Sequence, residues 1–314
     1  MATTIVTPSC LGNEIANNYN NPPLAPIPII DISLLSSCSE EGENELQKLK
    51  LALTSWGCFQ AVGHRVESSF LDKVSEITKR FFALPMEKKH KYDREANSLE
   101  GYGNVPNVSK KIIFNHSERI LLKVAPENER RIERWPCNPT DFGDVLDEYS
   151  AIMKSTSRFL LMQRRIRLLN LEKNCFLNAY RDEELIGARF NYYPESASSD
   201  IVVGAEAHSD VSGITILLQD KEVEGLQVLK DGQWFRVAIL PDALFVNVGD
   251  QLQIISNGIF KSPMHRVIVE SKKERISVAA FHLPKYEVEI GPVQSLMDEN
   301  RPQQYMRLKD YRGF

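Results

Sequence analysis

The second half of this 314-residue chain is dominated by short runs of β-branched and aromatic residues. Each run is four to eight residues long, a usual strand length, and several are separated by Gly, Pro, Asp or Asn, which favour turns. Many short strands at close spacing are typical of a jelly roll or a barrel. We expect strands at 188–193, 214–219, 226–229, 234–238, 244–248, 252–255, 265–270 and 275–282.

Two histidines and one aspartate in this half have the residue types of a metal site. His208 and Asp210 stand two positions apart, so on a strand both side chains would leave the same face. His265 follows Asp210 by 265 − 210 = 55 positions and joins them only if the sheet folds back on itself. Such a triad occupies one face of a ferrous ion and leaves the other open. Taken singly, a surface His-Ser-Asp turn and a hydrogen-bonded strand histidine are the alternatives, so the prediction depends on the ordered set.

A second pair of polar residues follows His265. Arg275 and Ser277 are two apart and would share one face of a strand. A guanidinium beside a hydroxyl can hold a carboxylate through charge-assisted forked hydrogen bonds, as a dicarboxylate cosubstrate requires. The alternative is a surface arginine paired with a neighbour such as Glu274.

The first half mixes helices with strands, because its apolar residues recur partly at helical spacing. Ser39 can cap the first helix and Gly57 can end it. We expect the apolar stripe of the last and longest helix to pack under the sheet rather than bind a cofactor. The expected elements are an edge strand at 27–32, a helix at 39–57, a strand at 58–62, a helix ending before Pro85 and a long helix at 142–169.

No repeat or low-complexity linker divides the chain. We expect a flexible tail at 1–26, an α/β region at 27–140, and the long helix with the jelly-roll core at 141–314, the last two forming one compact unit. A net charge of −4 gives no electrostatic reason to expect nucleic acid or an anionic membrane as a partner.

The cysteines are scattered, odd in number and without a CxxC pair, which favours free thiols in a reducing compartment. The first residues are polar and lack the apolar run of a signal peptide, so the expected location is the cytoplasm. We also expect a monomer. The cysteines are Cys10, Cys38, Cys58, Cys137 and Cys175.

Further motifs surround these residues. The chain carries Trp56-Gly-Cys-Phe-Gln, Gly101-Tyr-Gly-Asn, Asn191-Tyr-Tyr-Pro, Gly225-Leu-Gln, Asn247-Val-Gly-Asp-Gln and Ser256-Asn-Gly. Together with the triad and the Arg275–Ser277 pair, this set resembles the plant iron(II)/2-oxoglutarate-dependent dioxygenases. The resemblance extends from about Pro28 to Arg301 and is strongest to the flavonol-synthase-like, codeine-O-demethylase-like and senescence-related branch.

The resemblance implies a double-stranded β-helix that holds Fe(II) with His208, Asp210 and His265. The cosubstrates would be 2-oxoglutarate and O2, with ascorbate in support. Asn191 and Tyr193 would assist Arg275 and Ser277 at the 2-oxoglutarate, and the substrate would contact Tyr102, His116 and Phe281.

The expected reaction is hydroxylation of a small hydrophobic metabolite such as a flavonoid, alkaloid or phenylpropanoid, releasing succinate and CO2. O-demethylation, desaturation and ring closure use the same first hydrogen abstraction and stay open.

The chain departs from the family pattern at three places. Gly63-His-Arg65 replaces the usual Asn-His-Gly, and Asn115-His116 replaces the usual Asp-Trp. Relatives commonly continue past the Arg301-Pro-x-x-Tyr305 element into a further helix, which leads us to expect a shorter or more open closure over the pocket. These departures motivate a competing hypothesis, a non-catalytic barrel that binds small molecules.

Overall fold

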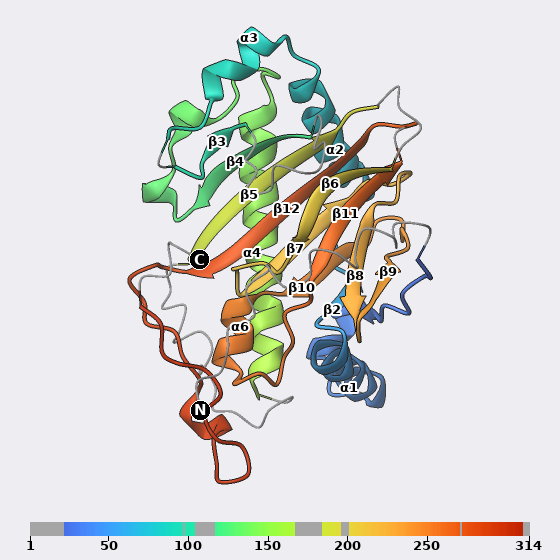
Figure 1. Ribbon diagram of the computed structural model, residues 1–314, viewed down its shortest axis with the longest axis vertical. Coiled ribbons are helices and arrows are strands. Elements are labelled where there is room, and N and C mark those ends of the chain that lie inside the picture. Colours follow the sequence, from blue (N-terminus) through green and yellow to red (C-terminus); the bar gives the residue numbers. More distant parts are fainter. Residues whose placement is uncertain are drawn as a thin grey trace.

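Two facing β-sheets form the centre of the molecule, with helices packed on the outer face of the larger one (Figure 1). The computed structural model describes residues 22–96, 98–103, 117–166, 184–195, 201–270 and 272–309. The larger sheet has the strand order β1-β2-β10-β7-β12-β5-β4-β3, and the smaller sheet has the order β6-β11-β8-β9. All pairs are antiparallel except β1 with β2.

The strands are β1 (Ile29–Asp31), β2 (Cys58–Val62), β3 (Gly101–Tyr102), β4 (Glu118–Ala125), β5 (Glu184–Tyr193), β6 (Ile201–His208), β7 (Ile214–Gln219), β8 (Leu226–Lys230), β9 (Gln233–Arg236), β10 (Leu244–Val248), β11 (His265–Glu270) and β12 (Arg275–Pro284). The α-helices are α1 (Glu40–Ser55), α2 (Ser68–Phe82), α3 (Met86–Lys89), α4 (Phe142–Ile166) and α6 (Asp250–Ile255). Short 3₁₀ turns are η3 (Ile32–Ser36), η4 (His90–Tyr92), η5 (Glu127–Glu129), η6 (Ile132–Arg134) and η7 (Gln294–Leu296).

The two faces of the larger sheet have different chemistry, because side chains alternate along each strand. On β12, Val278 and Ala280 join the main hydrophobic core, whereas Ser277, Ala279 and Phe281 line a cavity between the sheets. The same alternation holds along β7 and β5. One face of the sheet therefore supplies stability and the other presents the polar groups of the site.

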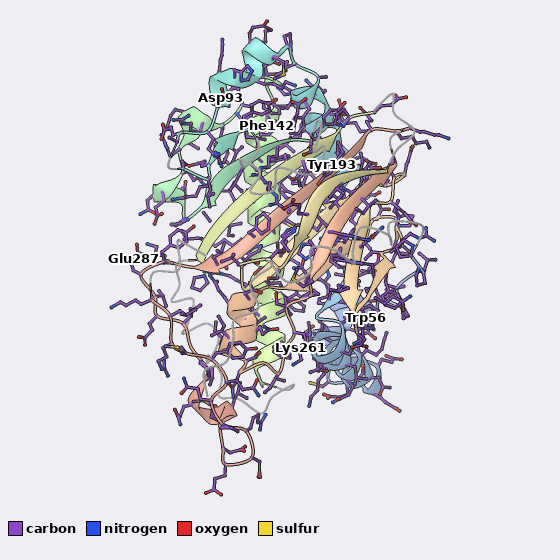
Figure 2. The ribbon with its side chains drawn as sticks, in the orientation of Figure 1. Trp56, Asp93, Phe142, Tyr193, Lys261 and Glu287 are labelled. Atoms are coloured by element: carbon purple, nitrogen blue, oxygen red, sulfur yellow. The ribbon has the colours of Figure 1, made fainter. Side chains whose placement is uncertain are left out.

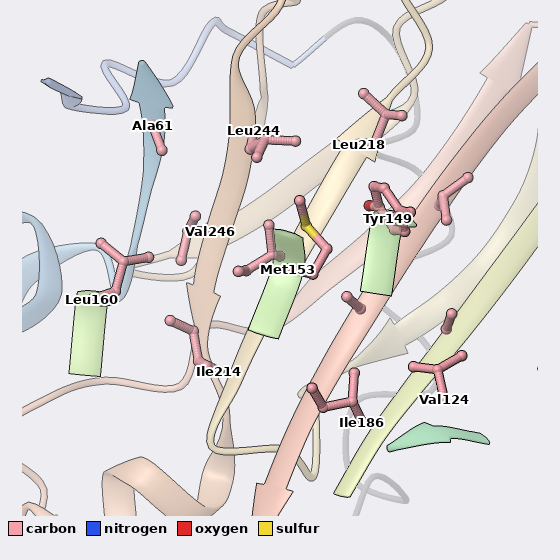
Figure 3. Packing of buried hydrophobic residues seen from close by; sticks show 14 of the residues in the cluster. Ala61, Val124, Tyr149, Met153, Leu160, Ile186, Ile214, Leu218, Leu244 and Val246 are labelled. Carbon is pink, nitrogen blue, oxygen red and sulfur yellow. The ribbon is translucent and has the colours of Figure 1, made fainter. Parts of the chain in front are cut away.

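Helix α4 closes the core side of the sheet, as its apolar periodicity predicted. Figure 3 shows Tyr149, Met153 and Leu160 directed at the apolar face of the larger sheet. At the start of the helix, the Phe142 ring centroid lies 5.1 Å from that of Phe190 on β5. The packing fixes β5 and its neighbours from behind, so the cavity-facing residues stand on a rigid support.

A smaller apolar cluster joins the sheets at the end opposite β3 and β4. It includes Leu226 and Val228 of β8 with Phe245 of β10. Trp56, labelled in Figure 2, follows the last residue of α1. Its ring packs edge-on against Phe235 of β9 at a centroid distance of 5.4 Å. Two residues of this cluster, Leu226 and Phe245, also line the cavity between the sheets.

The strand predictions at 214–219, 244–248 and 265–270 are confirmed at both ends. The prediction at 252–255 is wrong, because this short apolar run belongs to α6, where Leu252 and Ile255 are buried on one helical face. Strand β6 was not among the predicted runs, and it ends at His208. His208 and Asp210 are therefore not on one strand: Asp210 lies in the loop that follows.

The described cysteines, Cys38, Cys58 and Cys137, form no disulfide, as predicted. Cys10, Cys175 and residues 1–21 of the tail predicted at 1–26 lie outside the described residues. None of the helices within the described ranges has the length and apolar character needed to cross a bilayer.

The start of α1 offers a test of the capping argument. The Ser39 hydroxyl accepts a hydrogen bond from the Gly42 backbone N–H at 3.2 Å. We expect Ser39→Ala to lower the free energy of unfolding by about 1 kcal/mol, measured by urea denaturation. Ser55→Ala at the other end of α1 is the control. The Ser55 hydroxyl donates to the Leu51 carbonyl within the same helix and caps no backbone N–H group. An equal loss in both variants would contradict the capping role.

Candidate metal centre and cosubstrate site

Three side chains converge at the end of the cavity where β6 and β11 meet. His208 and His265 are register partners on these antiparallel strands, with ring centroids 4.3 Å apart. The Oδ1 atom of Asp210 lies 3.7 Å from His208 Nε2 and 3.6 Å from His265 Nε2. These three atoms are the one group of potential ligands for a metal ion found among the described residues. Their separation suits a single ion held by all three.

Hydrogen bonds orient both imidazoles toward this point. His208 Nδ1 lies 2.7 Å from the Glu206 carbonyl, and His265 Nδ1 lies 3.1 Å from the Pro263 carbonyl. A carbonyl can only accept, so each Nδ1 carries the proton and each Nε2 presents a lone pair. This arrangement, in which the second ring nitrogen binds a carbonyl, is the usual support of a metal-ligating histidine.

The carboxylate of Asp210 is oriented in the same way. Its Oδ2 atom accepts hydrogen bonds from Thr215 Oγ1 at 2.6 Å and from Asn247 Nδ2 at 2.8 Å. Thr215 comes from β7 and Asn247 from β10, so two strands of the larger sheet hold a residue that belongs to a loop. The other oxygen, Oδ1, is left to face the two imidazoles.

The protonation states fit a metal centre. Burial lowers the pKa of His208 to about 4, and the neighbouring His265 acts in the same direction, so the ring is neutral at pH 7. Burial opposes ionisation of Asp210, but the two imidazoles and its hydrogen bonds outweigh that effect and lower its pKa to about 2. Metal ligation requires neutral imidazole and ionised carboxylate, and the site presents both.

At the opposite end of the cavity lies Arg275, whose side chain is almost fully buried. Its Nε donates to the Val223 carbonyl at 3.3 Å, while Nη1 is buried without a hydrogen-bond partner. A buried donor left unpaired is costly, and a carboxylate would satisfy it. Gly225 makes room for this arginine: a Cβ at that position would lie 2.8 Å from Arg275 Nε.

The residues expected to assist Arg275 surround it. Tyr193 is its register partner on β5, and the guanidinium carbon lies 5.3 Å from the centre of the Tyr193 ring. Two residues further along the pairing, Asn191 Nδ2 lies 3.3 Å from Ser277 Oγ, to which it donates. Arg275, Ser277, Asn191 and Tyr193 thus form one continuous polar surface on β12 and β5.

The triad and this polar surface line a single cavity of about 520 Å³. Its walls also include apolar residues from both sheets, so a small organic molecule could lie against them beside the polar groups. The apolar lining residues are Ala205, Ala207, Leu217, Leu226, Phe245, Val267, Ala279 and Phe281.

The three residues expected to contact substrate differ in position. Phe281 lines the cavity. Tyr102 does not: its ring packs against Phe81 in the core, and its hydroxyl donates to Glu118. The position of Tyr102 therefore corrects the expectation that it contacts substrate. His116 lies outside the described residues.

Sequence reasoning missed several residues of the site. Thr215 and Asn247 were not singled out individually, although Asn247 begins one of the motifs that carried the resemblance. Arg119 and Arg189 were also missed, although both line the cavity. Only the pairing of β4 with β5 brings these two arginines together.

Comparisons with known proteins agree with this geometry. A model of the 2OG-Fe(II) oxygenase superfamily matches residues 184–284, and a model of the N-terminal part of non-haem dioxygenases in morphine synthesis matches residues 27–138. Protein SRG1 of Arabidopsis thaliana is 38% identical over 288 residues, covering 91% of this chain and 80% of that protein. Codeine O-demethylase of Papaver somniferum is 38% identical over 284 residues, covering 90% and 78%.

A solved structure of JOX2 in complex with 2OG, Fe and JA shares the fold with a TM-score of 0.82 at 34% identity, covering 93% of this chain and 84% of that one. The chain belongs to the 2-oxoglutarate and iron(II)-dependent oxygenase superfamily. It is an oxidoreductase of the plant dioxygenase type and acts on small metabolites, so the hypothesis of a non-catalytic barrel is wrong.

Each part of the site has a distinct role in that chemistry. His208, Asp210 and His265 are placed so that they would hold ferrous iron on one side, and Arg275 with Ser277 would bind the distal carboxylate of 2-oxoglutarate. Iron with 2-oxoglutarate and dioxygen supplies the oxidation of a substrate C–H bond, with release of succinate and CO2. The protein orients these partners and keeps bulk water away by enclosing them between two sheets.

The support of Asp210 can be tested separately from the ligands. Thr215→Val removes the hydroxyl donor with little change in shape, which leaves Asn247 as the partner of Asp210 Oδ2. We expect a roughly 10- to 100-fold weaker affinity for ferrous iron, measured by anaerobic titration. Thr78→Val in α2 is a matched control, because that buried hydroxyl only donates to Val74 O. Unchanged iron affinity in Thr215→Val would show that Asp210 needs no such support.

Proposed function

We propose that this dioxygenase hydroxylates a C–H bond of a small hydrophobic plant metabolite. The observation that carries the proposal is the single cavity that joins the triad to Arg275 and continues along apolar walls. With 2-oxoglutarate between iron and Arg275, the remaining space lies beside the metal. A substrate placed there presents its C–H bond to the oxidant, and hydroxylation needs no further chemical group from the protein.

O-demethylation is the second candidate, supported by the relatives. Codeine O-demethylase and thebaine 6-O-demethylase of Papaver somniferum are 38% and 36% identical, and a flavonoid 7-O-demethylase of Ocimum basilicum is 37% identical. Both reactions begin with oxidation of a C–H bond, and in demethylation the oxidised methyl group then leaves as formaldehyde. The carbon that lies beside the metal decides between them.

The test combines turnover with product mass. Purified protein is incubated with ferrous iron, ascorbate, 2-oxoglutarate and a fractionated plant metabolite extract, and succinate is measured alongside the masses of new products. Hydroxylation predicts a gain of one oxygen, whereas O-demethylation predicts loss of one methylene with formaldehyde release. Loss of two hydrogens would indicate desaturation or ring closure. Absence of substrate-dependent succinate across all fractions, with iron and 2-oxoglutarate bound, would overturn the proposal.

A further inference from the structure

Two further arginines, outside the triad and the Arg275–Ser277 pair, lie on the β4–β5 side of the cavity. Arg119 of β4 and Arg189 of β5 both line it. Arg119 is the register partner of Asn191, and Arg189 stands two residues before Asn191 on the same strand. This diagonal placement puts both side chains on the same face of the sheet. The backbone positions of such a diagonal pair are about 7–8 Å apart. Long side chains at that spacing can bring both guanidinium groups to one ligand.

Both side chains are half-buried and held in position. Arg119 Nε donates to the Gly103 carbonyl at 3.3 Å, which leaves its two terminal nitrogens for other partners. The guanidinium carbon of Arg189 lies 4.7 Å from the centre of the Phe281 ring, and its Nε is buried without a hydrogen-bond partner. A cation stacked on an aromatic face has a fixed plane, so Arg189 presents oriented donors.

The two positive charges lack an acidic partner within the described residues. No ion pair or hydrogen bond joins either arginine to a carboxylate there. The adjacent carboxylate of Glu118 is bonded to Lys89 and Tyr102 instead. Burial lowers the pKa of Arg119 to about 10, with the charges of Arg189 and Arg94 acting in the same direction. Like charges brought together in this way favour an anion between them.

The cosubstrate does not supply that anion. The positive charges of ferrous iron and Arg275 already offset the negative charges of Asp210 and 2-oxoglutarate. The arginines also occupy different positions along β5. Arg275 pairs with Tyr193, near the end of the strand, whereas Arg119 pairs with Asn191. Arg189 lies two residues before Asn191, further still from Tyr193. The arginine pair is therefore a second cationic subsite. It lies in the same cavity as His208, Asp210 and His265.

We propose that Arg119 and Arg189 bind a carboxylate of the substrate, so that the molecule oxidised is a small hydrophobic carboxylic acid. The inference rests on the proposed function and narrows its substrate class. Two planar guanidinium groups match a planar carboxylate through forked hydrogen bonds. The apolar walls formed by residues such as Leu217 and Phe245 receive the rest of the molecule. A protonated amine, as in many alkaloids, is repelled by the same pair.

Binding of matched probes tests the subsite without turnover. The protein loaded with ferrous iron and 2-oxoglutarate is titrated under nitrogen with cinnamate, 4-phenylbutyrate and the methyl ester of each. We expect each acid to bind about 10- to 100-fold more tightly than its ester, because the ester keeps the apolar part and lacks the charge. Equal affinity for acid and ester, or tighter binding of the esters, would overturn the proposal.

Variants assign that preference to the two arginines. Arg119→Met and Arg189→Met each keep a long apolar side chain and remove the charge, and each is expected to lose most of the acid-over-ester preference. Affinity for 2-oxoglutarate is expected to stay within about twofold, and a loss as large as that for the acids would place the pair in the cosubstrate site instead. Arg94→Met is the control, since this nearby arginine does not line the cavity. It is expected to retain the preference.

A turnover experiment separates failure of this inference from failure of the proposed function. A plant extract is divided into acidic, neutral and basic fractions, and substrate-dependent succinate is measured with each. Succinate from the acidic fraction supports both proposals. Succinate from the neutral or basic fraction alone keeps the dioxygenase function and overturns the carboxylate subsite. If no fraction gives succinate, the proposed function fails, and the acid-to-ester ratio decides the inference by itself.

Discussion

Replacing His265 by alanine is expected to lower iron-dependent succinate release by more than about 100-fold. Loss of a supporting group around a metal ligand already costs 10- to 100-fold in affinity or activity, and this change removes a ligand itself. The remaining pair, His208 and Asp210, cannot occupy a full face of the ion. Iron retained after dialysis, measured by elemental analysis, and succinate release should fall together.

The matched control is His90→Ala. His90 is an exposed histidine whose Nδ1 lies 3.0 Å from the Asp93 carboxylate, and it does not line the cavity. We expect it to keep iron binding and turnover, which shows that losing a histidine does not by itself disturb the protein. Succinate release near the native level in His265→Ala, with iron still bound, would sink the triad assignment.

The residue types of the metal centre could be read from the sequence, but one step of the reasoning was wrong. We placed His208 and Asp210 on one strand, whereas β6 ends at His208 and Asp210 follows in a loop. The three residues still meet because Thr215 and Asn247 hold Asp210 from the neighbouring sheet. The sequence spacing therefore identified the three residues of the triad. It did not show that hydrogen bonds from two other strands hold Asp210 in place.

Other features depended on packing that a single sequence does not encode locally. The run at 252–255 is apolar enough for a strand, and short apolar runs do not distinguish a strand from a buried helical turn. Arg119 and Arg189 are 189 − 119 = 70 positions apart, and their meeting depends on the register of β4 against β5. A register shift of one residue would have turned either side chain to the other face.

Replacing Arg275 by leucine is expected to weaken 2-oxoglutarate binding by roughly 30- to 4,000-fold, since truncating one partner of a buried charged pair costs about 2–5 kcal/mol. The lost affinity is expected to come from the contact with the distal carboxylate of 2-oxoglutarate, because the buried Nη1 of Arg275 has no other hydrogen-bond partner. Arg275→Lys should recover only part of the affinity, since an ammonium group lacks the planar fork. Affinity is measured by anaerobic titration of the iron-loaded protein.

Pyruvate makes this measurement specific, because it has the keto-acid end that binds iron and lacks the distal carboxylate. The native protein should strongly prefer 2-oxoglutarate over pyruvate, and Arg275→Leu should bind the two with similar affinity. Arg236→Leu on β9, which removes an arginine paired with Glu224 outside the cavity, should keep the native preference. Both keto acids bind only the folded, iron-loaded fraction of each variant. Partial unfolding therefore lowers both apparent affinities equally and leaves the ratio of the two affinities unchanged. A preference that survives in Arg275→Leu would therefore mean that another residue holds the distal carboxylate, with Arg119 and Arg189, which line the same cavity, as the candidates.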